Sequence, residues 1–434
     1  MGAIKRLNQR YEAFSEITDV LPQDAPFTFS AKDNLCAKGF QARAGSKILD
    51  GYRPPFDATP VRRLREAGGV LIGKTNMDEF GFGTFSTHSG FGVPKNPFDI
   101  ERACGGSSGG AACAAALIPG HVALGVSTGG SISCPASFCG VVGLTPTYGR
   151  VSRYGLIDYG NSLDKVGLIS RTIIDIERLL PVISGRDPKD PTSCCAPSLD
   201  LSKVRKGPLA VPKECLIGLD RTVKEAFDRS VLGLRDMGYE VEEVDMPSLR
   251  FSMPAYYVLA TAEASTNLAR YCGMRFGVSE KEYHQHFNDY FATTRSKSFG
   301  DEAKRRILLG TFCRMVGFRD KYYLKALSVR QAVMKEYEMI FEGHSLVLSP
   351  TMPFIAPRFD MIAKMRPVEM YSADFLTIPP NLTGLPHLSI PCGYASGLPI
   401  GMQAVAPHWE EGALIHFGKR WESWFDYAAP EVKA

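Results

Sequence analysis

Phe27-Thr-Phe-Ser-Ala-Lys32 and Val70-Leu-Ile-Gly73 are two short segments with the composition of β-strands. Apolar and polar residues alternate in the first segment, whereas the second is apolar throughout and is therefore typical of a strand buried on both faces. A helical segment lies between them: Thr59 can cap it, Pro60 occupies its first turn, and Gly68-Gly69 ends it. Strand, helix and strand at this spacing predict a βαβ unit in a mostly parallel sheet.

Strand and helix patterns continue beyond a middle segment, residues 105–149, that is rich in glycine, serine and alanine. The elements expected there are helices near 223–234, 302–341 and 410–424, and strands near 239–244, 345–348, 388–391 and 399–405. No repeat, low-complexity linker or shift in composition divides the 434 residues. We therefore expect a single α/β domain, residues 1–434, in which helices cover both faces of a central mixed, mostly parallel sheet.

Composition and charge are those of an ordinary globular protein. Hydrophobic residues make up 44% of the chain and charged residues 22%, and the formal net charge is only +4. No run of Lys and Arg reaches the length of a nucleic-acid-binding arm. No segment is apolar over the ~20 residues that a membrane-spanning helix needs, and residues 1–14 lack the apolar core of a secretory signal. Strong direct binding to nucleic acid and insertion into a membrane are therefore not expected.

The eleven cysteines are spread along the chain without a Cys-x-x-Cys pair, and several lie inside apolar segments. This pattern predicts reduced thiols in a cytoplasmic protein, although the matrix of an organelle is equally reducing. The adjacent pair Cys194-Cys195 is interpreted as two ordinary loop cysteines rather than a redox centre. No metal site is predicted.

Unusual polar chemistry is concentrated in three segments: Ala31-Lys-Asp-Asn34, Gly105-Gly-Ser-Ser-Gly-Gly110 and Ser127-Thr-Gly-Gly-Ser-Ile-Ser-Cys-Pro135. Each has an ordinary explanation when taken alone, since a lysine on a strand is usually solvated and a Gly/Ser run is usually a loop or an anion site at a helix start. Neither glycine-rich run ends in the Gly-Lys-Ser/Thr of a phosphate-binding P-loop, so nucleotide binding is not indicated.

Gly105 to Gly109 also matches the G-x-S-x-G pattern of a nucleophile elbow. That motif should directly follow an apolar strand, but here it follows Asn96-Pro-Phe-Asp-Ile-Glu-Arg-Ala-Cys104. Its catalytic triad also needs a histidine, and the nearest candidates, His88 and His121, have no distinguishing context. A Ser-His-Asp hydrolase is therefore disfavoured.

Together, the three segments resemble the amidase signature family, with Ser107 75 residues after Lys32 (107 − 32) and Ser131 24 residues after Ser107 (131 − 107). The resemblance extends from about residue 29 to residue 407, with the catalytic core at about 27–172. It implies the α/β amidase fold, a Ser-Ser-Lys triad made of these three residues, and a cis peptide bond at Gly106–Ser107. The implied oxyanion hole consists of the backbone N–H groups of Thr128, Gly129, Gly130 and Ser131.

The chemistry of such a triad is physically consistent. An amide is a poor electrophile, so Ser131 needs a base that removes its proton during attack. Ser107 can relay that proton to Lys32, provided that burial keeps the lysine neutral. The neighbouring Asp33 favours the cation, but strand alternation points the two side chains to opposite faces. Backbone N–H groups at the second glycine-rich run would then stabilise the oxyanion.

Six further segments resemble the A subunits of tRNA-dependent glutamine amidotransferases within this family. They are Gly73-Lys-Thr-Asn-Met-Asp-Glu-Phe80, Pro146-Thr-Tyr-Gly-Arg-Val-Ser-Arg-Tyr-Gly155, Asn161-Ser-Leu-Asp-Lys-Val-Gly167, Tyr256-Tyr-Val258, Arg305-Arg-Ile-Leu-Leu-Gly-Thr311 and Asp374-Phe-Leu-Thr-Ile-Pro-Pro-Asn381. By this resemblance Arg306 binds the carboxylate of glutamine, Asp374 binds its α-ammonium group, and Tyr256 forms a pocket wall. A free amino acid needs one cationic and one anionic partner, and a guanidinium gives the carboxylate a bidentate grip.

The resemblance implies that the chain hydrolyses glutamine and supplies ammonia for converting Glu-tRNA(Gln) to Gln-tRNA(Gln). A B subunit would use the ammonia together with ATP and Mg²⁺, and a small C subunit would hold the two together, so no cofactor is expected in this chain. Use of Asp-tRNA(Asn) as a second substrate stays open. Two alternatives also stay open: a stand-alone amidase for another small amide, and a catalytically weak scaffold subunit.

Two residues depart from the family pattern beside the nucleophile. The usual Asp of S-D-T-G-G-S is Ser127, and the usual Arg after G-G-S-I is Ser133, so the ion pair that these two form is missing. Losing both partners leaves no unpaired buried charge. We expect the loss to be tolerated but to loosen the oxyanion loop. The double variant Ser127→Asp, Ser133→Arg should then turn over substrate faster than the natural chain, and equal rates would contradict this.

Overall fold

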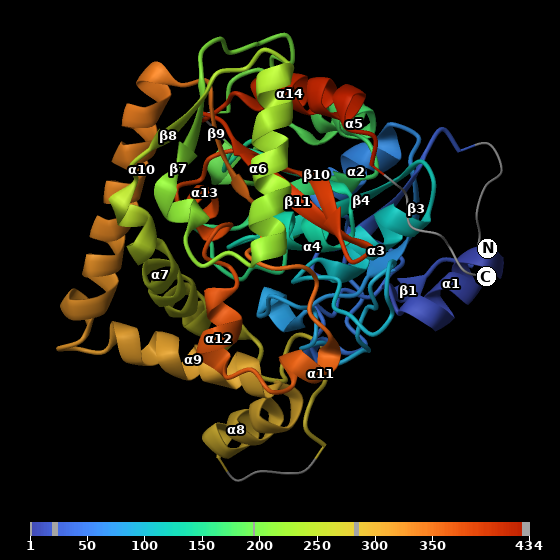
Figure 1. The fold of residues 1–434 in the computed structure, drawn as a ribbon. Helices are drawn as coiled ribbons and strands as arrows, with labels where there is room; N and C mark the ends of the chain where they lie inside the picture. Colours follow the sequence, from blue (N-terminus) through green and yellow to red (C-terminus); the bar gives the residue numbers. More distant parts are fainter. Residues whose placement is uncertain (1, 20–24, 194–195, 282–285, 428–434) are drawn as a thin grey trace.

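The structure is a computed structural model that describes residues 2–19, 25–193, 196–281 and 286–427; the Cys194-Cys195 pair lies outside these residues. Its strands are β1 (Phe14–Ile17), β2 (Thr28–Lys32), β3 (Val70–Thr75), β4 (His121–Ser127), β5 (Val142–Thr145), β6 (Lys165–Ser170), β7 (Leu209–Pro212), β8 (Val241–Val244), β9 (Leu346–Pro350), β10 (His387–Ala395) and β11 (Leu398–Val405). They form one sheet in the order β1-β3-β2-β4-β6-β5-β10-β11-β9-β7-β8 (Figure 1). The α/β class and the mixed sheet expected from the sequence are confirmed.

Parallel pairing is confined to two groups of three strands. β2 pairs with β3 and β4, and β7 pairs with β8 and β9, whereas the six other pairings among the described strands are antiparallel. The expectation of a mostly parallel sheet is therefore corrected. One reason is the β10–β11 hairpin, where Ser396 and Gly397 have φ of 51° and 75°. Such a two-residue turn joins only antiparallel strands.

The predicted βαβ unit is present. β2 and β3 are parallel, and α2 (Thr59–Glu66) lies between them in the chain. The helix differs from the prediction at its start, because Ala58 is the N-cap residue and the Thr59 hydroxyl donates instead to Asp187 Oδ2 at 2.5 Å. The chain leaves this helix at Gly68 as predicted, with a φ of +88° that favours glycine.

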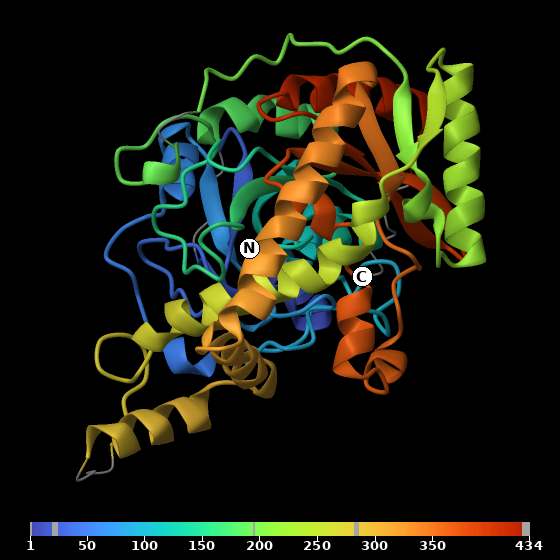
Figure 2. The same ribbon diagram turned by 90° about the vertical axis from the view of Figure 1, so that its left-hand side faces the viewer.

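Helices cover both faces of the sheet (Figures 1 and 2). α2, α5 (Ile173–Ile183) and α14 (Glu411–Trp424) pack on one face, and α3 (Gly109–Leu117) and α4 (Ser133–Phe138) pack on the other. The remaining described helices are α1 (Gly2–Tyr11), α6 (Arg221–Asp236), α7 (Ser252–Asn267), α8 (Phe287–Ser298), α9 (Asp301–Arg314), α10 (Lys325–Gly343), α11 (Phe359–Ile362), α12 (Pro367–Ser372) and α13 (Ile378–Leu382). The continuous helical pattern over 302–341 is divided into α9 and α10, with a π-helical turn at Asp320–Leu324 before α10.

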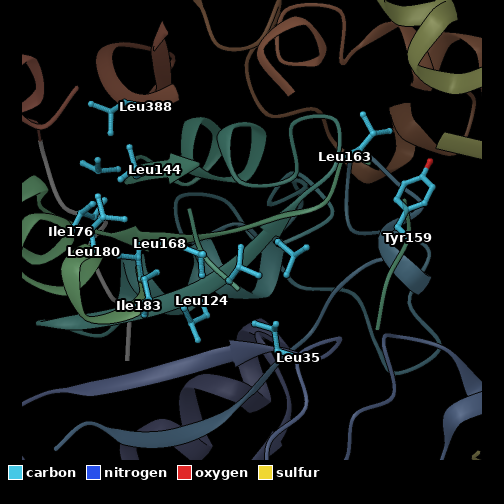
Figure 3. Packing of buried hydrophobic residues seen from close by; sticks show 14 of the residues in the cluster. Leu35, Leu124, Leu144, Tyr159, Leu163, Leu168, Ile176, Leu180, Ile183 and Leu388 are labelled. Atoms are coloured by element: carbon cyan, nitrogen blue, oxygen red, sulfur yellow. The ribbon is translucent and has the colours of Figure 1, made fainter. Parts of the chain in front are cut away.

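Leucine and isoleucine side chains fill the core between the central strands and α5 (Figure 3). Leu124, Leu144 and Leu168 come from neighbouring strands and Ile176 and Leu180 from α5, and all five are fully buried. Burial of each such side chain contributes about 1.5–3 kcal/mol to folding. This packing fixes β4 and β6, whose ends carry the polar segments described below. No helix among the described residues is long and apolar enough to span a bilayer.

Candidate active site

The structure brings the predicted lysine and the first predicted serine into direct contact. Lys32 is the last residue of β2, and Val126 lies near the end of β4, the parallel neighbour of β2. Lys32 Nζ lies 2.7 Å from Ser107 Oγ and donates to the Val126 carbonyl oxygen at 3.0 Å. The Gly106–Ser107 peptide bond is cis, as the family resemblance implied. A lysine and a serine that are 75 residues apart in the sequence are therefore in direct hydrogen-bond contact.

The second predicted serine lies beside this pair, in the loop between β4 and α4. The Ser131 carbonyl oxygen accepts a hydrogen bond from the backbone N–H of Ser108 at 3.2 Å. Ser131 is 8% exposed, whereas Lys32 and Ser107 are each 1% exposed. The Ser131 hydroxyl makes no hydrogen bond to the described residues, so the structure does not join it to Ser107 directly. Ser131 is thus the most exposed of the three residues, and Lys32 and Ser107 lie deeper in the protein.

Burial changes the acid–base properties of the lysine. Removal from water lowers the pKa of Lys32 to about 7, against the opposing influence of the Asp78 and Asp164 carboxylates. The side chain of Asp33 points away, as predicted, and accepts a hydrogen bond from the Gly45 backbone N–H at 3.3 Å. Near neutral pH a large fraction of Lys32 is therefore the free amine that a general base requires.

Two residues that the sequence did not point to, Asp78 and Ser86, support the serine-rich loop, residues 105–110. Asp78 is buried and accepts hydrogen bonds from the backbone N–H groups of Ser86 and His88, both at 2.9 Å. The Ser86 hydroxyl donates to the Gly105 carbonyl oxygen at 2.8 Å and accepts from the Gly109 N–H at 3.1 Å. The loop is therefore fixed on both sides of Ser107. Asp78 lies in one of the segments that resemble the amidotransferase subunits, but its residue type alone does not indicate a role.

The segment from Thr128 to Ser131 has the geometry of an anion site. The backbone N–H groups of Thr128, Gly129, Gly130 and Ser131 donate to no acceptor among the described residues. The Thr128 hydroxyl is engaged elsewhere, because it donates to Asp164 Oδ1 at 2.7 Å. Gly130 has a φ of +145°, and a Cβ there would come within 2.0 Å of the Thr377 hydroxyl oxygen, so only glycine fits. Four backbone N–H groups are thus unengaged by the described residues beside Ser131.

Arg306 lies in an aromatic cage on α9. The Nε atom donates to Glu302 Oε1 at 2.8 Å, and Nη1 donates to the Tyr159 hydroxyl at 2.5 Å. Four rings lie 5.1–5.7 Å from the guanidinium carbon, those of Phe82, Tyr159, Tyr257 and Tyr371. The third nitrogen, Nη2, has no hydrogen-bond partner among the described residues. One guanidinium nitrogen is therefore free to bind an anion.

Asp374 provides the matching carboxylate. Its Oδ2 accepts hydrogen bonds from the Thr84 hydroxyl at 2.8 Å and the Tyr257 hydroxyl at 3.2 Å, and Oδ1 accepts none from the described residues. Burial raises the pKa of Asp374 to about 7, although both hydroxyls and Arg306 favour the ionised form. Tyr256, the predicted pocket wall, packs against Gly129 of the 128–131 segment, since a Cβ at Gly129 would lie 2.5 Å from its ring. Two adjacent tyrosines look alike in the sequence, so their different roles were not predictable.

A pocket of about 610 Å³ opens beside Glu302, but Arg306, Asp374 and the predicted catalytic residues are not among the described residues that line it. Its lining includes Glu302, Arg305, His88 and Met370. Glu302 also accepts a hydrogen bond from Arg306 Nε, so one side chain both lines the pocket and holds the Arg306 guanidinium. His88 therefore faces this pocket, and His121 hydrogen-bonds to strand hydroxyls with its pKa lowered to about 3 by burial. Neither histidine contacts a predicted catalytic serine.

Comparison with known proteins gives a consistent result. A family model described as Amidase matches residues 27–415. The chain is 41% identical to the A subunit of glutamyl-tRNA(Gln) amidotransferase from Persephonella marina, over 98% of this chain and 88% of that protein. It is 42% identical to the corresponding protein of Desulforamulus reducens, over 94% and 85% of the two chains. The crystal structure of the A subunit from Thermotoga maritima matches with a TM-score of 0.85 and 34% identity, covering 100% of this chain and 93% of that one.

Proposed function

The chain belongs to the amidase family, in the group of glutamyl-tRNA(Gln) amidotransferase A subunits, and we propose that it is a glutaminase that supplies ammonia to that reaction. The observation that carries the choice of substrate is the pair of Arg306 and Asp374. Each is held in place by the protein and keeps one atom unengaged by the described residues, Nη2 and Oδ1 respectively. A carboxylate and an α-ammonium group fit this pair, and an incoming ammonium would favour the ionised form of Asp374.

One turn of the chain links Asp374, the carboxylate of the proposed glutamine-binding pair, to the loop that carries Ser131, the proposed nucleophile. The backbone N–H of Thr377 donates to the Asp374 carbonyl oxygen at 3.0 Å, and the Thr377 hydroxyl donates to the Gly129 carbonyl oxygen at 3.0 Å. A glutamine held at Asp374 would therefore extend its side chain toward the loop that carries Ser131. The pocket beside Glu302 is the route of entry that we propose.

Hydrolysis then proceeds through an ester on Ser131. The Ser131 oxygen attacks the amide carbon while its proton passes to Ser107, which gives its own proton to neutral Lys32. The oxyanion accepts hydrogen bonds from the free backbone N–H groups of 129–131. Return of the proton through the same path releases ammonia and leaves a glutamyl ester on Ser131. Water attacks this ester with the same base and yields glutamate.

The proposed partners follow from the relatives. Ammonia passes to a B subunit, which activates Glu-tRNA(Gln), or also Asp-tRNA(Asn), with ATP and Mg²⁺ bound to that partner. A small C subunit holds the two chains together. The hydrolysis described for this chain uses its own side chains and backbone and requires no cofactor.

Arg306→Ala is expected to raise KM for glutamine about 10- to 100-fold with a smaller change in kcat. A hydrogen-bonded charge contributes about 1.5–3 kcal/mol, and the carboxylate is bound equally in the ground state and the transition state. Ammonia release by the purified chain, alone and with B and C subunits, measures this. Arg314→Ala, an exposed arginine at the other end of α9, is the control and should leave KM unchanged.

The same assay separates the alternatives. Turnover of other amides without turnover of glutamine would identify a stand-alone amidase. Unchanged KM in Arg306→Ala would contradict the clamp. No turnover of any amide, with or without partners, would identify a scaffold subunit.

A further inference from the structure

A short segment near the C-terminal end of the chain contacts the oxyanion loop, residues 127–131, at two points. Asn381 Oδ1 accepts a hydrogen bond from the Ser127 hydroxyl at 3.0 Å. Thr377 Oγ1 lies 3.0 Å from the Gly129 carbonyl oxygen and 3.2 Å from the Asp374 carbonyl oxygen of its own turn, and its single proton is directed at the nearer acceptor, Gly129. Ser127, Thr377 and Asn381 are all completely buried, so water does not compete for these bonds.

The orientation of the Asn381 amide is fixed by the groups behind it. Asn381 Nδ2 donates to the Thr377 carbonyl oxygen at 2.8 Å and lies 3.3 Å from His387 Nε2. His387 Nδ1 lies 3.1 Å from the Leu385 carbonyl oxygen, which also accepts from Lys165 Nζ at 2.9 Å. A carbonyl only accepts, so Nδ1 carries the proton and Nε2 accepts from the amide of Asn381. The amide oxygen is thereby directed at Ser127.

Neutral histidine is required for this arrangement. An imidazolium would present a second N–H to the Asn381 amide nitrogen, which is itself a donor. Burial and the neighbouring Lys165 hold the pKa of His387 well below its usual range, in agreement with the geometry. The hydrogen bonds therefore run in one direction, from Ser127 through Asn381 and His387 to the Leu385 carbonyl oxygen, which also accepts from Lys165.

Thr377 sets the direction of the Gly130 N–H, because the Gly129–Gly130 peptide unit is rigid. The carbonyl of Gly129 and the N–H of Gly130 belong to the same planar trans peptide and point in opposite directions. A hydrogen bond that fixes the Gly129 carbonyl therefore also fixes the direction of the Gly130 N–H. That N–H has no other partner among the described residues.

We propose that Thr377 and Asn381 are positioning residues of the oxyanion hole, which hold the 127–131 loop with its N–H groups directed at the reacting carbonyl oxygen. This role rests on the proposed amide hydrolysis, and it assigns an anchoring function to neutral hydrogen bonds in the loop where the family pattern has an ion pair that this chain lacks. The Ser133 hydroxyl, the other departure, is buried without a partner among the described residues and takes no part in this anchor.

The test compares three variants of the full chain with its partner subunits. Thr377→Val keeps the shape of the side chain and removes the hydroxyl, so kcat should fall about 10- to 100-fold while KM for glutamine changes less than about twofold. Thr377→Ser restores the hydroxyl and should recover kcat to within a few-fold of the natural chain. Thr383→Val is the matched control, because this buried hydroxyl bonds, among the described residues, to backbone carbonyls of its own segment, Pro379 at 2.9 Å and Pro380 at 3.4 Å.

The outcomes separate a positioning role from a structural one. Melting temperatures of Thr377→Val and Thr383→Val should fall by similar amounts, but only the first should lose kcat. Full kcat in Thr377→Val, an equal loss in Thr383→Val, or a loss confined to KM would each overturn the inference. If the natural chain hydrolyses another amide but not glutamine, the same variants are compared by their kcat for that amide, since the hydrolysis of every amide forms an oxyanion. A natural chain inactive on all amides would reject the inference together with the proposed function.

Discussion

Ser131→Ala is expected to reduce kcat for glutamine hydrolysis by a factor on the order of 10⁵ to 10⁶, because it removes the attacking oxygen. The Ser131 hydroxyl makes no hydrogen bond to the described residues, so the fold should lose little. The backbone hydrogen bond from Ser108 to the Ser131 carbonyl oxygen is unaffected by the change. Ammonia release gives the rate, and thermal melting should give a stability within about 0.5 kcal/mol of the natural chain.

Ser133→Ala is the matched control for this variant. It removes a hydroxyl two residues further along, which is buried and without a hydrogen-bond partner among the described residues. Turnover should be preserved in this control. Hydrolysis by Ser131→Ala at more than a trace of the natural rate would remove Ser131 from the role of nucleophile, and equal loss in both variants would point to damage of the loop.

Lys32→Met should lower kcat by about 10²- to 10⁴-fold and abolish the dependence of rate on pH near neutrality. Methionine fills a similar space but has no lone pair of sufficient basicity. In the proposed mechanism the active form of Lys32 is the neutral amine. Since the pKa of Lys32 is about 7, kcat at saturating glutamine, where the bound ammonium group keeps Asp374 ionised, should rise with pH, reach half of its maximum near pH 7 and level off above it. Rates measured between about pH 5.5 and 9 record this profile.

Lys32→Arg distinguishes the loss of a base from the loss of a charge. Arginine keeps the positive charge and does not release its proton in this pH range, so it should be as inactive as methionine. An active arginine variant, or a rise of rate with pH that survives in Lys32→Met, would show that another group is the base.

The proposed catalytic serines and lysine could be picked out from the sequence because residue type and spacing carry most of the information about them. Lys32, Ser107 and Ser131 are marked by glycine-rich surroundings that an ordinary strand or loop does not need. The βαβ unit was also predictable, since Pro60 and Gly68 are local signals for the start and end of its helix, although Thr59 does not cap it. These features depend on short segments of sequence, and the structure brings those segments together.

Supporting contacts were not predictable, because they join segments far apart in the chain. Asp78 accepts from the backbone N–H of Ser86, whose hydroxyl contacts the 105–110 loop, and Asn381 binds Ser127 across a separation of 254 residues. Tyr256 and Tyr257 are adjacent in sequence, yet only the second donates to Asp374. Whether neighbouring strands pair in parallel or antiparallel was also not predictable, because the pattern of a strand indicates which side chains are buried and not which way the neighbouring strand runs.

The order of strands in the sheet has a consequence for the time at which the enzyme becomes active during its synthesis. β10 and β11 are the last of the described strands in the chain, but they lie in the interior of the sheet, between β5 and β9. A ribosome must therefore release nearly the whole polypeptide before the two halves of the sheet can be joined. Thr377 and Asn381 emerge at the same late stage, so an incomplete nascent chain carries the three proposed catalytic residues without a finished oxyanion hole. If the proposed roles of Thr377 and Asn381 are right, this topology delays glutamine hydrolysis until the chain is nearly complete.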